Sequence, residues 1–271
     1  MRETFMDRVR VLQKELRTRT CLESPEPLGA FVIGGHAVGR LTPKVMAVMR
    51  HDPILTQWVD AGDSQTFTLL AEPHFEALNL ALDQVTLRLE ALGLTQRRRP
   101  EKLDIFNDEG QVLAQAERSV FRTLGLTTHV VRLLALTPHG HFWLQRRSPN
   151  KPIGAGLWDN LAAGMMAASE TPQTAMLREL HEEAGLNVGA DTLVPLSTLS
   201  FDYQCPVPEG WMQERTASYL LTVPSEITPT NLDGEADAFA SFSPRQAVDL
   251  IEADRLMPEA ARLLLEWIVA R

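Results

Sequence analysis

The sequence predicts an α/β protein in two parts, a smaller α+β domain over residues 1–125 and a second α/β domain over residues 126–271. Three observations support this prediction. Strand-like and helix-like apolar patterns occur in both parts. A short segment at residues 122–126 separates the last strand of the first part from a new apolar strand. The length of 271 residues, with 44% apolar and 23% charged residues, suits two modest globular domains.

The first part opens with a helix over residues 5–17, because Phe5, Val9, Leu12 and Leu16 recur three or four residues apart. Two apolar runs around the Gly-Gly pair at 34–35 predict a β-hairpin. A short helix follows the Thr-Pro pair at 42–43 and reaches about residue 51. Residues 66–71 and 111–118 have strand patterns, and residues 75–92 form the clearest helix. The regular spacing in that helix favours core packing over a cofactor-binding motif.

The second part continues with strands and helices. Residues 129–138 and 139–148 predict two strands joined by a turn at 138–140, and residues 216–224 predict another strand. A turn at Asp233 and Gly234 precedes a strand within the segment 235–243. Pro244 and Pro258 each mark the first turn of a closing helix.

A helix over residues 172–184 has clear start and stop signals. Thr171 is expected at its N-cap, Pro172 at its first helical position, and Gly185 just after its end. A neighbouring apolar stripe would dock this helix on a sheet. Side chains on its remaining face are therefore held rigidly.

Three glutamates share that face, since Glu179, Glu182 and Glu183 stand at positions i, i+3 and i+4. Carboxylates packed this closely raise one another's pKa unless cations lie among them. Mg2+ prefers hard oxygen ligands and leaves room in its shell for waters and substrate phosphates. We therefore expect Mg2+ at this face, with Mn2+ able to replace it. Glu182 and Glu183 are the expected principal ligands, and Glu179 is the third ligand or the catalytic base.

The helix lies inside a longer pattern. Residues 164–186 read GMMAASETPQTAMLRELHEEAGL, which places Gly164, Glu170, Arg178 and Gly185 at fixed offsets from the glutamates. A merely solvated acidic helix would not explain the glycines or the distant glutamate. With no side chain, Gly164 would let its carbonyl approach the metal as a ligand. The pattern G-x5-E-x7-R-E-apolar-x-E-E-x-G-apolar resembles the Nudix box and meets it at every specified position.

The resemblance to Nudix hydrolases implies a fold, a reaction and residue roles. The fold is an α/β/α sandwich with a mixed sheet over residues 126–271. The reaction is attack of water on phosphorus in a diphosphate linked to an organic moiety, with magnesium neutralising phosphate oxygens and a glutamate taking the proton. In this family the counterparts of Arg178 and Glu170 pair with each other, so both are expected to brace the loop and helix.

Arg146 and Arg147 are candidates for binding a substrate phosphate. They point to opposite faces of a strand, so one of them can hold a phosphate through two hydrogen bonds. The sequence favours neither. Glu235 follows the turn at 233–234, and Nudix enzymes often recruit a ligand or base from such a loop. A solvated carboxylate is the alternative interpretation of Glu235.

Trp158, Asp159 and Asn160 precede the box and are candidates for the mouth of a substrate pocket. An aromatic ring beside polar groups suits the recognition of a ring in the substrate. The alternative for Trp158 is packing in the core beneath the loop.

The whole chain resembles one branch of the family in more detail. FVIGGHAVGRLTP near the start, QRRSPNKPIGAGLWDNLAAGM before the box and DGEADAF after it are similar to the branch related to the Nudix domain fused to fungal thiamine pyrophosphokinase. That branch has an extra amino-terminal domain. The resemblance implies conversion of damaged forms of thiamine diphosphate to monophosphates. Nucleotide sugars and dinucleotides stay open as alternative substrates, because their pyrophosphatases use the same box.

A different class of function is a non-catalytic Nudix module that senses a ligand. Such sensors commonly lose box glutamates and gain a basic DNA-binding domain, whereas this chain has every box glutamate and a nearly neutral first part. An enzyme is therefore favoured. The isopentenyl diphosphate isomerases of the superfamily use a cysteine ahead of the box, and neither Cys21 nor Cys205 has that position. Each cysteine is expected to be a small packing residue.

The net charge of −9 is concentrated in the second part. Residues 1–125 carry 16 basic and 17 acidic residues, and residues 126–271 carry 10 and 18. This balance disfavours nucleic acid as a partner, and the basic triplet at 97–99 has the composition of a solvated helix exit. No apolar run reaches the roughly 20 residues of a membrane span, and the amino terminus lacks a signal-peptide core, so a cytoplasmic location is expected. Two roles stay open for the first part, a cover for the pocket or a homodimer interface.

Overall fold

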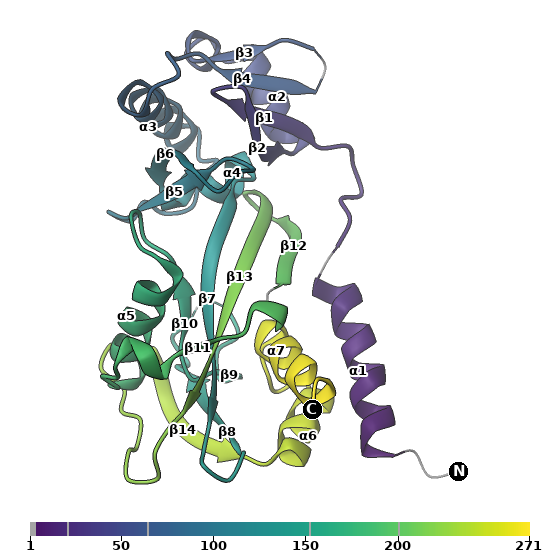
Figure 1. The fold of residues 1–271 in the computed structure, drawn as a ribbon. Coiled ribbons are helices and arrows are strands. Elements are labelled where there is room, and N and C mark those ends of the chain that lie inside the picture. The colour runs from purple at the N-terminus through teal and green to yellow at the C-terminus, as the bar shows by residue number, and fades with distance from the viewer. Residues whose placement is uncertain (1–3, 21, 64, 152, 200) are drawn as a thin grey trace.

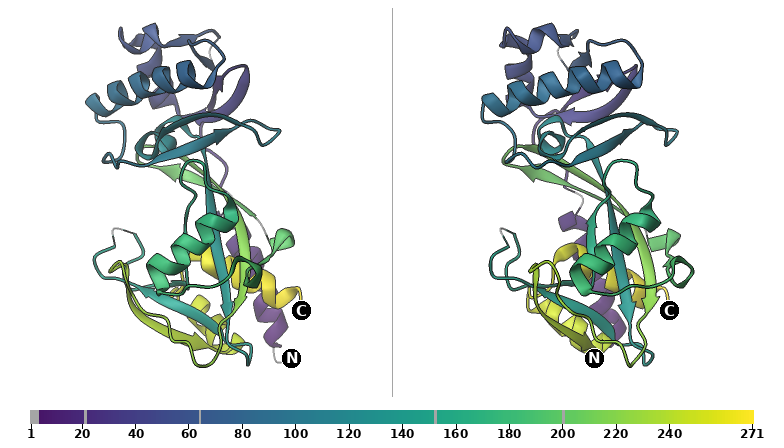
Figure 2. Two further views of the ribbon diagram at one scale, coloured as in Figure 1. Left: turned by 60° about the vertical axis from the view of Figure 1, so that its left-hand side comes forward. Right: turned by 90° about the vertical axis from the view of Figure 1, so that its left-hand side faces the viewer.

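Two long parallel strands, β7 (Thr127–Leu136) and β13 (Gly210–Thr222), begin beneath the first part and run through the second part of the molecule (Figure 1). The structure is a computed structural model, and it describes residues 4–20, 22–63, 65–151, 153–199 and 201–271. The two further views confirm that the first part lies at one end of these strands (Figure 2).

A mixed eight-stranded sheet forms the centre of the second part. Its path is β11-β13-β7-β8-β14, with β12 paired to β13, β10 to β7 and β9 to β8. Strands β7 and β13 are parallel, and the other pairs are antiparallel. The remaining strands are β8 (Phe142–Arg147), β9 (Trp158–Asn160), β10 (Ala163–Met165), β11 (Val194–Pro195), β12 (Phe201–Val207) and β14 (Ala236–Phe242).

Helices cover both faces of this sheet. Helix α5 (Pro172–Ala184) packs Met176 and Leu180 against Val131 and Leu133 of β7. Helices α6 (Pro244–Glu252) and α7 (Pro258–Val269) cover the opposite face, where Leu134 belongs to a separate apolar cluster. The alternation of side chains along β7 supplies both layers, since successive residues point to opposite faces. The α/β/α sandwich with a mixed sheet predicted from the sequence is confirmed.

The first part is a smaller α+β unit with its own apolar core, as predicted. A four-stranded sheet has the order β2-β1-β4-β3, and a separate hairpin joins β5 to β6. Phe31 and Phe67, which are fully buried, anchor the core. The elements are β1 (Gly29–Ile33), β2 (His36–Leu41), α2 (Pro43–His51), β3 (Val59–Ala61), β4 (Thr66–Leu69), α3 (Phe75–Ala91), β5 (Lys102–Phe106), β6 (Val112–Glu117) and α4 (Phe121–Leu124).

Helix α1 (Phe5–Thr20) departs from the expected division at residue 126. It packs beside α6 and α7 at the far end of the molecule from the four-stranded sheet (Figures 1 and 2). Val9, fully buried, and Leu16 join the apolar cluster of the second part. Arg17 forms an ion pair with Glu266 of α7 at 2.8 Å. The helical pattern correctly predicted an apolar face, but the partner of that face is encoded about 250 residues later.

Several short strands differ from the sequence-based expectations. Strands β3, β5, β9, β10 and β12 were not anticipated, and β13 begins six residues before the predicted strand at 216. Polar and proline residues break the apolar alternation in these segments, such as Asp104 in β5 and Pro206 in β12. Their strand conformation comes from pairing with neighbours, which overrides local preference.

Two further expectations concern cysteines and membranes. Cys205 is half-buried on β12 with a free thiol, whereas Cys21 lies outside the described residues. Among the helices of the described ranges, none combines the length and apolar character required to cross a bilayer.

Candidate active site

Helix α5 carries the three box glutamates, and its two ends are fixed locally. The Thr171 hydroxyl accepts a hydrogen bond from the Thr174 backbone N–H, and the Thr174 hydroxyl accepts one from the Thr171 N–H at 2.9 Å. Pro172 lies in the first turn, where its missing N–H costs no hydrogen bond. Gly185 ends the helix with φ of 66°, a left-handed conformation that favours glycine. The local sequence therefore sets the register of the glutamates.

Glu183 is the most buried of the three, with 6% of its surface exposed. Its Oε2 atom accepts hydrogen bonds from the Ala163 N–H and from Gln145 Nε2, both at 2.9 Å. Within the described ranges no lysine or arginine forms an ion pair with it. Burial raises the pKa of Glu183 well above its usual value, and the nearby Glu179 carboxylate raises it further. This carboxylate needs an added positive charge to be stable in its ionised form.

Glu179 lies directly against Gly164 of β10. A Cβ atom added at Gly164 would overlap the Glu179 carboxylate, so only glycine leaves room for it. Burial raises the pKa of Glu179, and the Arg178 guanidinium offsets part of that effect. The first glycine of the box therefore leaves the space that the Glu179 carboxylate occupies beside β10.

Arg178 connects the glutamates to the preceding loop. Its Nε and Nη2 atoms donate to the two carboxylate oxygens of Glu170 at 2.7 and 2.9 Å, and Nη2 also donates to the Met165 carbonyl at 3.0 Å. Its Nη1 atom donates to Glu179 at 2.7 Å and to Glu182 at 3.1 Å. The guanidinium holds the pKa of Glu170 below its ordinary value. Arg178 thus orders two box carboxylates and the loop in one contact network.

A second carboxylate-bearing segment meets the helix from the loop before β14. Oxygens of Glu183, Asp233 and Glu235 lie within 4.8 Å of one another, the one group of three with such spacing found among the described residues. The loop is tied to the helix end because the Thr230 N–H donates to the Ala184 carbonyl at 2.8 Å. Glu235 is therefore placed at the box, and Asp233 joins it. Glu182 is half exposed at 48% and contacts Arg178 from the outer side.

The end of β8 and the segment that follows it bring positively charged side chains to this acidic cluster. Lys151 forms an ion pair with Glu235. Arg147 Nη1 donates to Asp159 Oδ2 at 2.8 Å, and its Nε donates to the Ile153 carbonyl at 3.1 Å. Asp159 is buried, and its charge acts on Glu183. Arg147 and Lys151 therefore bring positive charge to these carboxylates.

Arg146 lies on the other face of the sheet. Its guanidinium donates to both oxygens of Asp237 at 2.8 and 3.1 Å and stands 6.0 Å from the centre of the Trp158 ring. The sequence left the choice between the two arginines open. Strand alternation places Arg147, and not Arg146, with the carboxylates.

Trp158 is a core residue and not part of a pocket mouth. It is 8% exposed, belongs to the apolar cluster with α7, and meets Phe242 edge-on with ring centres 4.8 Å apart. Asn160 is 1% exposed, and both polar atoms of its amide lack a hydrogen-bond partner in the described part of the chain. Residues 158 and 160 share one face of β9, so only Asp159 between them reaches the box side.

Asp233 and Lys151 are the residues that sequence reasoning missed. Asp233 was assigned only to a turn, and in the structure it lies beside Glu235 in a bend where the Glu235 N–H donates to Asp233 Oδ1 at 2.8 Å. Lys151 lies in a loop without a periodic pattern, and nothing local relates it to the helix. Its position follows from the pairing of β8 with β9 and β14.

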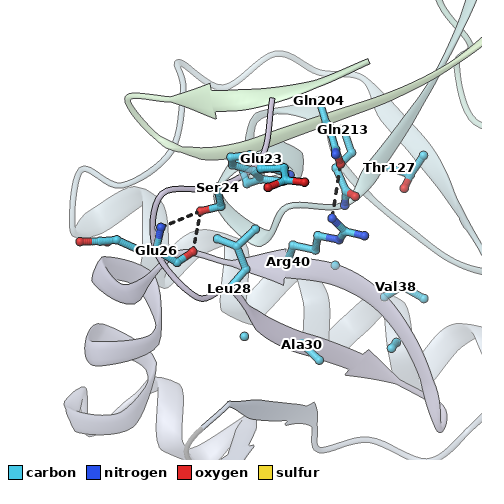
Figure 3. Close-up of a pocket in the computed structure, with 14 residues that line it drawn as sticks. Glu23, Ser24, Glu26, Leu28, Ala30, Val38, Arg40, Thr127, Gln204 and Gln213 are labelled. Atoms are coloured by element: carbon cyan, nitrogen blue, oxygen red, sulfur yellow. Dashed lines mark hydrogen bonds between the residues drawn. The ribbon is translucent and has the colours of Figure 1, made fainter. Parts of the chain in front are cut away.

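A cavity of about 710 Å³ lies elsewhere, between β1 and β2 of the first part and the β12–β13 hairpin. Figure 3 shows Arg40 directed toward Gln204, to which Nη1 donates at 3.3 Å. The lining includes Glu23, Glu26 and Gln213 but none of the box residues. The carboxylate cluster, and not this larger cavity, is the candidate active site, because the chemistry is concentrated there.

The carboxylate cluster fits a hard divalent cation. Its donors are carboxylate oxygens, the ligand type that Mg2+ and Mn2+ prefer. Glu183 is held ready by two hydrogen bonds to one oxygen, which leaves its other oxygen available. Burial and neighbouring carboxylates raise the pKa values of Glu179 and Glu183, and a cation bound beside them would favour their ionised forms.

Comparison with known proteins places this site in context. A model of the NUDIX domain family matches residues 126–267, more than half of the 271 residues. The chain is 24% identical over 157 residues to Nudix hydrolase 24, chloroplastic, of Arabidopsis thaliana, covering 56% of this chain and 42% of the relative. It is 25% identical over 218 residues to YJR142W of Saccharomyces cerevisiae, covering 72% and 62%.

A Nudix hydrolase of Deinococcus radiodurans is 29% identical over 100 residues, covering 37% of this chain and 58% of the relative. The matches to these three curated relatives span less than two thirds of each relative's length. Among solved structures, the crystal structure of DR0079 from Deinococcus radiodurans has a TM-score of 0.48 at 23% identity, covering 62% of this chain and 98% of that one.

Proposed function

The chain belongs to the NUDIX domain family, and from that membership we propose that it is a magnesium-dependent pyrophosphohydrolase that cleaves a diphosphate linked to an organic moiety. One observation supports the proposal above all. The box carboxylate Glu183 lies within 4.8 Å of Asp233 and Glu235 from a separate loop, and Arg147 and Lys151 bring positive charge to this cluster. A solvated acidic helix would have no reason to bury Glu183 without a positive partner.

The residues proposed to hold the metal combine the predicted set with the loop. Glu182 and Glu183, with the Gly164 carbonyl, come from the box, and Asp233 and Glu235 come from the segment before β14. When bound, a divalent cation neutralises phosphate oxygens and lowers the pKa of the attacking water. Mn2+ has the same ligand preference and is expected to replace Mg2+.

The protein's own groups are proposed to move the proton and hold the substrate. Glu179 is the third ligand or the base, and its raised pKa brings it closer to the neutral range where a base is effective. Arg147 would turn its guanidinium toward a phosphate with two donors. Lys151 supplies a second positive charge opposite the leaving phosphate. Arg178 keeps Glu179 and Glu182 in place and does not enter the chemistry.

The substrate proposed is a damaged form of thiamine diphosphate, released as the monophosphate. This finer assignment rests on the resemblance of residues 145–165 and 233–239 to the thiamine-related branch. Asn160 lies on the opposite face of β9 from the box and is left out of this substrate site.

A substrate panel tests the proposal. The purified protein with Mg2+ would be incubated with thiamine diphosphate, its oxidised analogues, ADP-ribose, NADH and dinucleoside polyphosphates, and phosphorus products would be followed by NMR. Fastest cleavage of an oxidised thiamine compound to its monophosphate supports the full assignment. A preference for a nucleotide over every thiamine compound would remove the thiamine assignment and keep the hydrolase. Absence of cleavage across the panel, with a ligand bound tightly, would favour the sensing module.

A further inference from the structure

The loop between β10 and α5 carries Glu170, and it is held by the first part of the chain. Figure 1 shows this loop rising from β10 toward the β5–β6 hairpin before it descends into α5. Ser169 in this loop has φ of 69°, a left-handed backbone conformation that residues other than glycine rarely adopt. Such a conformation persists when the surroundings hold it in place. The surroundings here belong to β5 and β6.

Three hydrogen bonds join the hairpin to the loop, and a fourth, from Gln115 to Asp104, lies within the hairpin. The Asp104 carboxylate of β5 accepts one from the Ser169 backbone N–H at 2.8 Å through Oδ2. The Ala168 N–H donates to the Lys102 carbonyl at 2.8 Å. Gln115 Nε2 of β6 donates to Asp104 Oδ1 at 2.8 Å and to Ser169 Oγ at 3.3 Å. Asp104 is 7% exposed, so its charge is removed from water and its hydrogen bonds to amides are strong.

The contacts continue from Ser169 to the metal-binding carboxylates. Glu170 directly follows Ser169, and its Oε2 accepts a hydrogen bond from the Ala167 N–H at 2.8 Å. Both Glu170 oxygens accept from Arg178, which in turn donates to Glu179 and Glu182. Every step has a donor–acceptor distance of 3.1 Å or less. A displacement of the loop at Ser169 would therefore move the guanidinium that orders two box glutamates.

We propose that Asp104 is a positioning residue for the active site, and that the first part of the chain serves to hold the box loop in its working conformation. The inference rests on the proposed function in taking the box carboxylates as metal ligands. It gives the amino-terminal part a role other than covering a pocket or forming a dimer. Asp104 touches neither metal nor substrate and acts only through Ser169, Glu170 and Arg178.

The test compares three variants of the full chain. Asp104→Asn keeps the size of the side chain but removes its charge, and it sets an amide donor against Gln115 or Ser169. Gln115→Ala is a milder change that removes one donor to Asp104. The matched control is Asp83→Asn, because exposed Asp83 pairs with Lys102 of the same hairpin at 3.2 Å and has no contact with the loop.

The first measurement is amide hydrogen exchange in the metal-free protein. Asp104→Asn should speed exchange at Ser169 and Glu170 about tenfold or more, Gln115→Ala less, and Asp83→Asn not at all. The second is Mn2+ binding followed by electron paramagnetic resonance, where Asp104→Asn should weaken affinity about threefold to tenfold. The third is kinetics on the best substrate of the panel, where kcat should fall with little change in KM. Unchanged exchange and unchanged Mn2+ affinity in Asp104→Asn would overturn the proposal.

A double-mutant comparison separates positioning from a general loss of stability. If Asp104 acts through Glu170, the effect of Asp104→Asn on Mn2+ affinity should vanish in a Glu170→Gln background. Additive effects with a lowered melting temperature would contradict positioning. The exchange measurement uses neither metal nor substrate, so it decides this inference even if the parent protein binds no Mn2+, a result that would instead defeat the proposed function.

Discussion

Glu183 shows at the scale of one residue how burial and charge are balanced in this site. The carboxylate sits between α5 and the sheet, with hydrogen bonds from Ala163 and Gln145 but with no ion-pair partner in the described part of the chain. A carboxylate whose pKa is raised in the folded protein stabilises the fold at pH values below its unfolded pKa of about 4.3. That contribution is lost as the pH rises through the folded pKa.

Replacing Glu183 by glutamine should therefore have opposite effects on function and on metal-free stability. Glu183→Gln should lower turnover by about two orders of magnitude or more, because the proposed metal ligand is lost. In the presence of EDTA, its unfolding free energy should exceed that of the parent increasingly as the pH rises above about 4.3 through the raised pKa. Urea denaturation between pH 4 and 8 measures the difference. Stability curves that stay parallel over this range would contradict the burial argument.

The two arginines at the end of β8 offer a matched pair. Arg147→Lys keeps the charge but removes the planar pair of donors, so kcat/KM should fall about tenfold to a hundredfold. Arg146→Lys, whose parent side chain pairs with Asp237 on the opposite face, should stay within about twofold of the parent. Steady-state kinetics on the same substrate measures both. Equal losses in the two variants would contradict the assignment of the substrate contact to Arg147 alone.

At the scale of elements, the site depends on how closely β10 approaches α5. Gly164 does not have a positive φ, so its backbone tolerates alanine, and the obstacle is the Glu179 carboxylate that fills the space of a side chain. A methyl group at position 164 would therefore break the contact between β10 and the Glu179 carboxylate of α5.

Gly164→Ala is expected to displace Glu179 and lower turnover by about a hundredfold, with a modest loss of stability of roughly 1–3 kcal/mol from overpacking. Gly62→Ala is the matched control, because an added Cβ there meets no atom within 4 Å and the residue has no positive φ. Kinetics and urea denaturation of both variants make the comparison. Full activity in Gly164→Ala would mean that Glu179 is not needed where the structure places it.

At the scale of the whole molecule, segments of each part of the chain pack against the other part. Helix α1 begins the sequence but packs on α6 and α7 of the second part, and β5 and β6 of the first part hold the box loop. The two parts therefore contact each other in several places, among them the β12–β13 hairpin, helix α1 and the box loop. The division of the chain at residue 126 therefore describes the order of the elements in the sequence, whereas the contacts of α1 and the box loop run across it.

Substitutions on α1 should therefore affect the stability of the second part. Val9→Asp would bury a charge among α6 and α7 and should lower the unfolding free energy by about 3 kcal/mol or more. Val11→Asp on the exposed side of the same helix, where Val11 is 49% exposed, should change it by less than about 0.5 kcal/mol. Thermal denaturation in the presence of EDTA measures both. A stable Val9→Asp protein would show that α1 is not part of this core.

The sequence by itself determined the features that depend on neighbouring residues. The ends of α5 and the shared face of Glu179, Glu182 and Glu183 follow from capping and helical spacing, so they could be predicted without a fold. The contact that requires glycine at 164 depends on the approach of β10 to α5 and could not be predicted in this way. The α/β/α class followed from the resemblance to Nudix hydrolases that the box carries. Short strands such as β9 and β10 could not be predicted, because three residues carry too little periodic signal and take their conformation from pairing.

Only the tertiary structure decided which distant groups meet α5. Asp159 rather than Asn160, Arg147 rather than Arg146, and Asp233 beside Glu235 depend on strand register and on a loop tied to the helix end by Thr230. The attachment of α1 to α7 and of Asp104 to Ser169 joins segments far apart in the chain. The physical reason is that the sequence shows which apolar faces and hydrogen-bonding groups must be buried against a partner. Which partner they contact depends on how the elements pack in three dimensions.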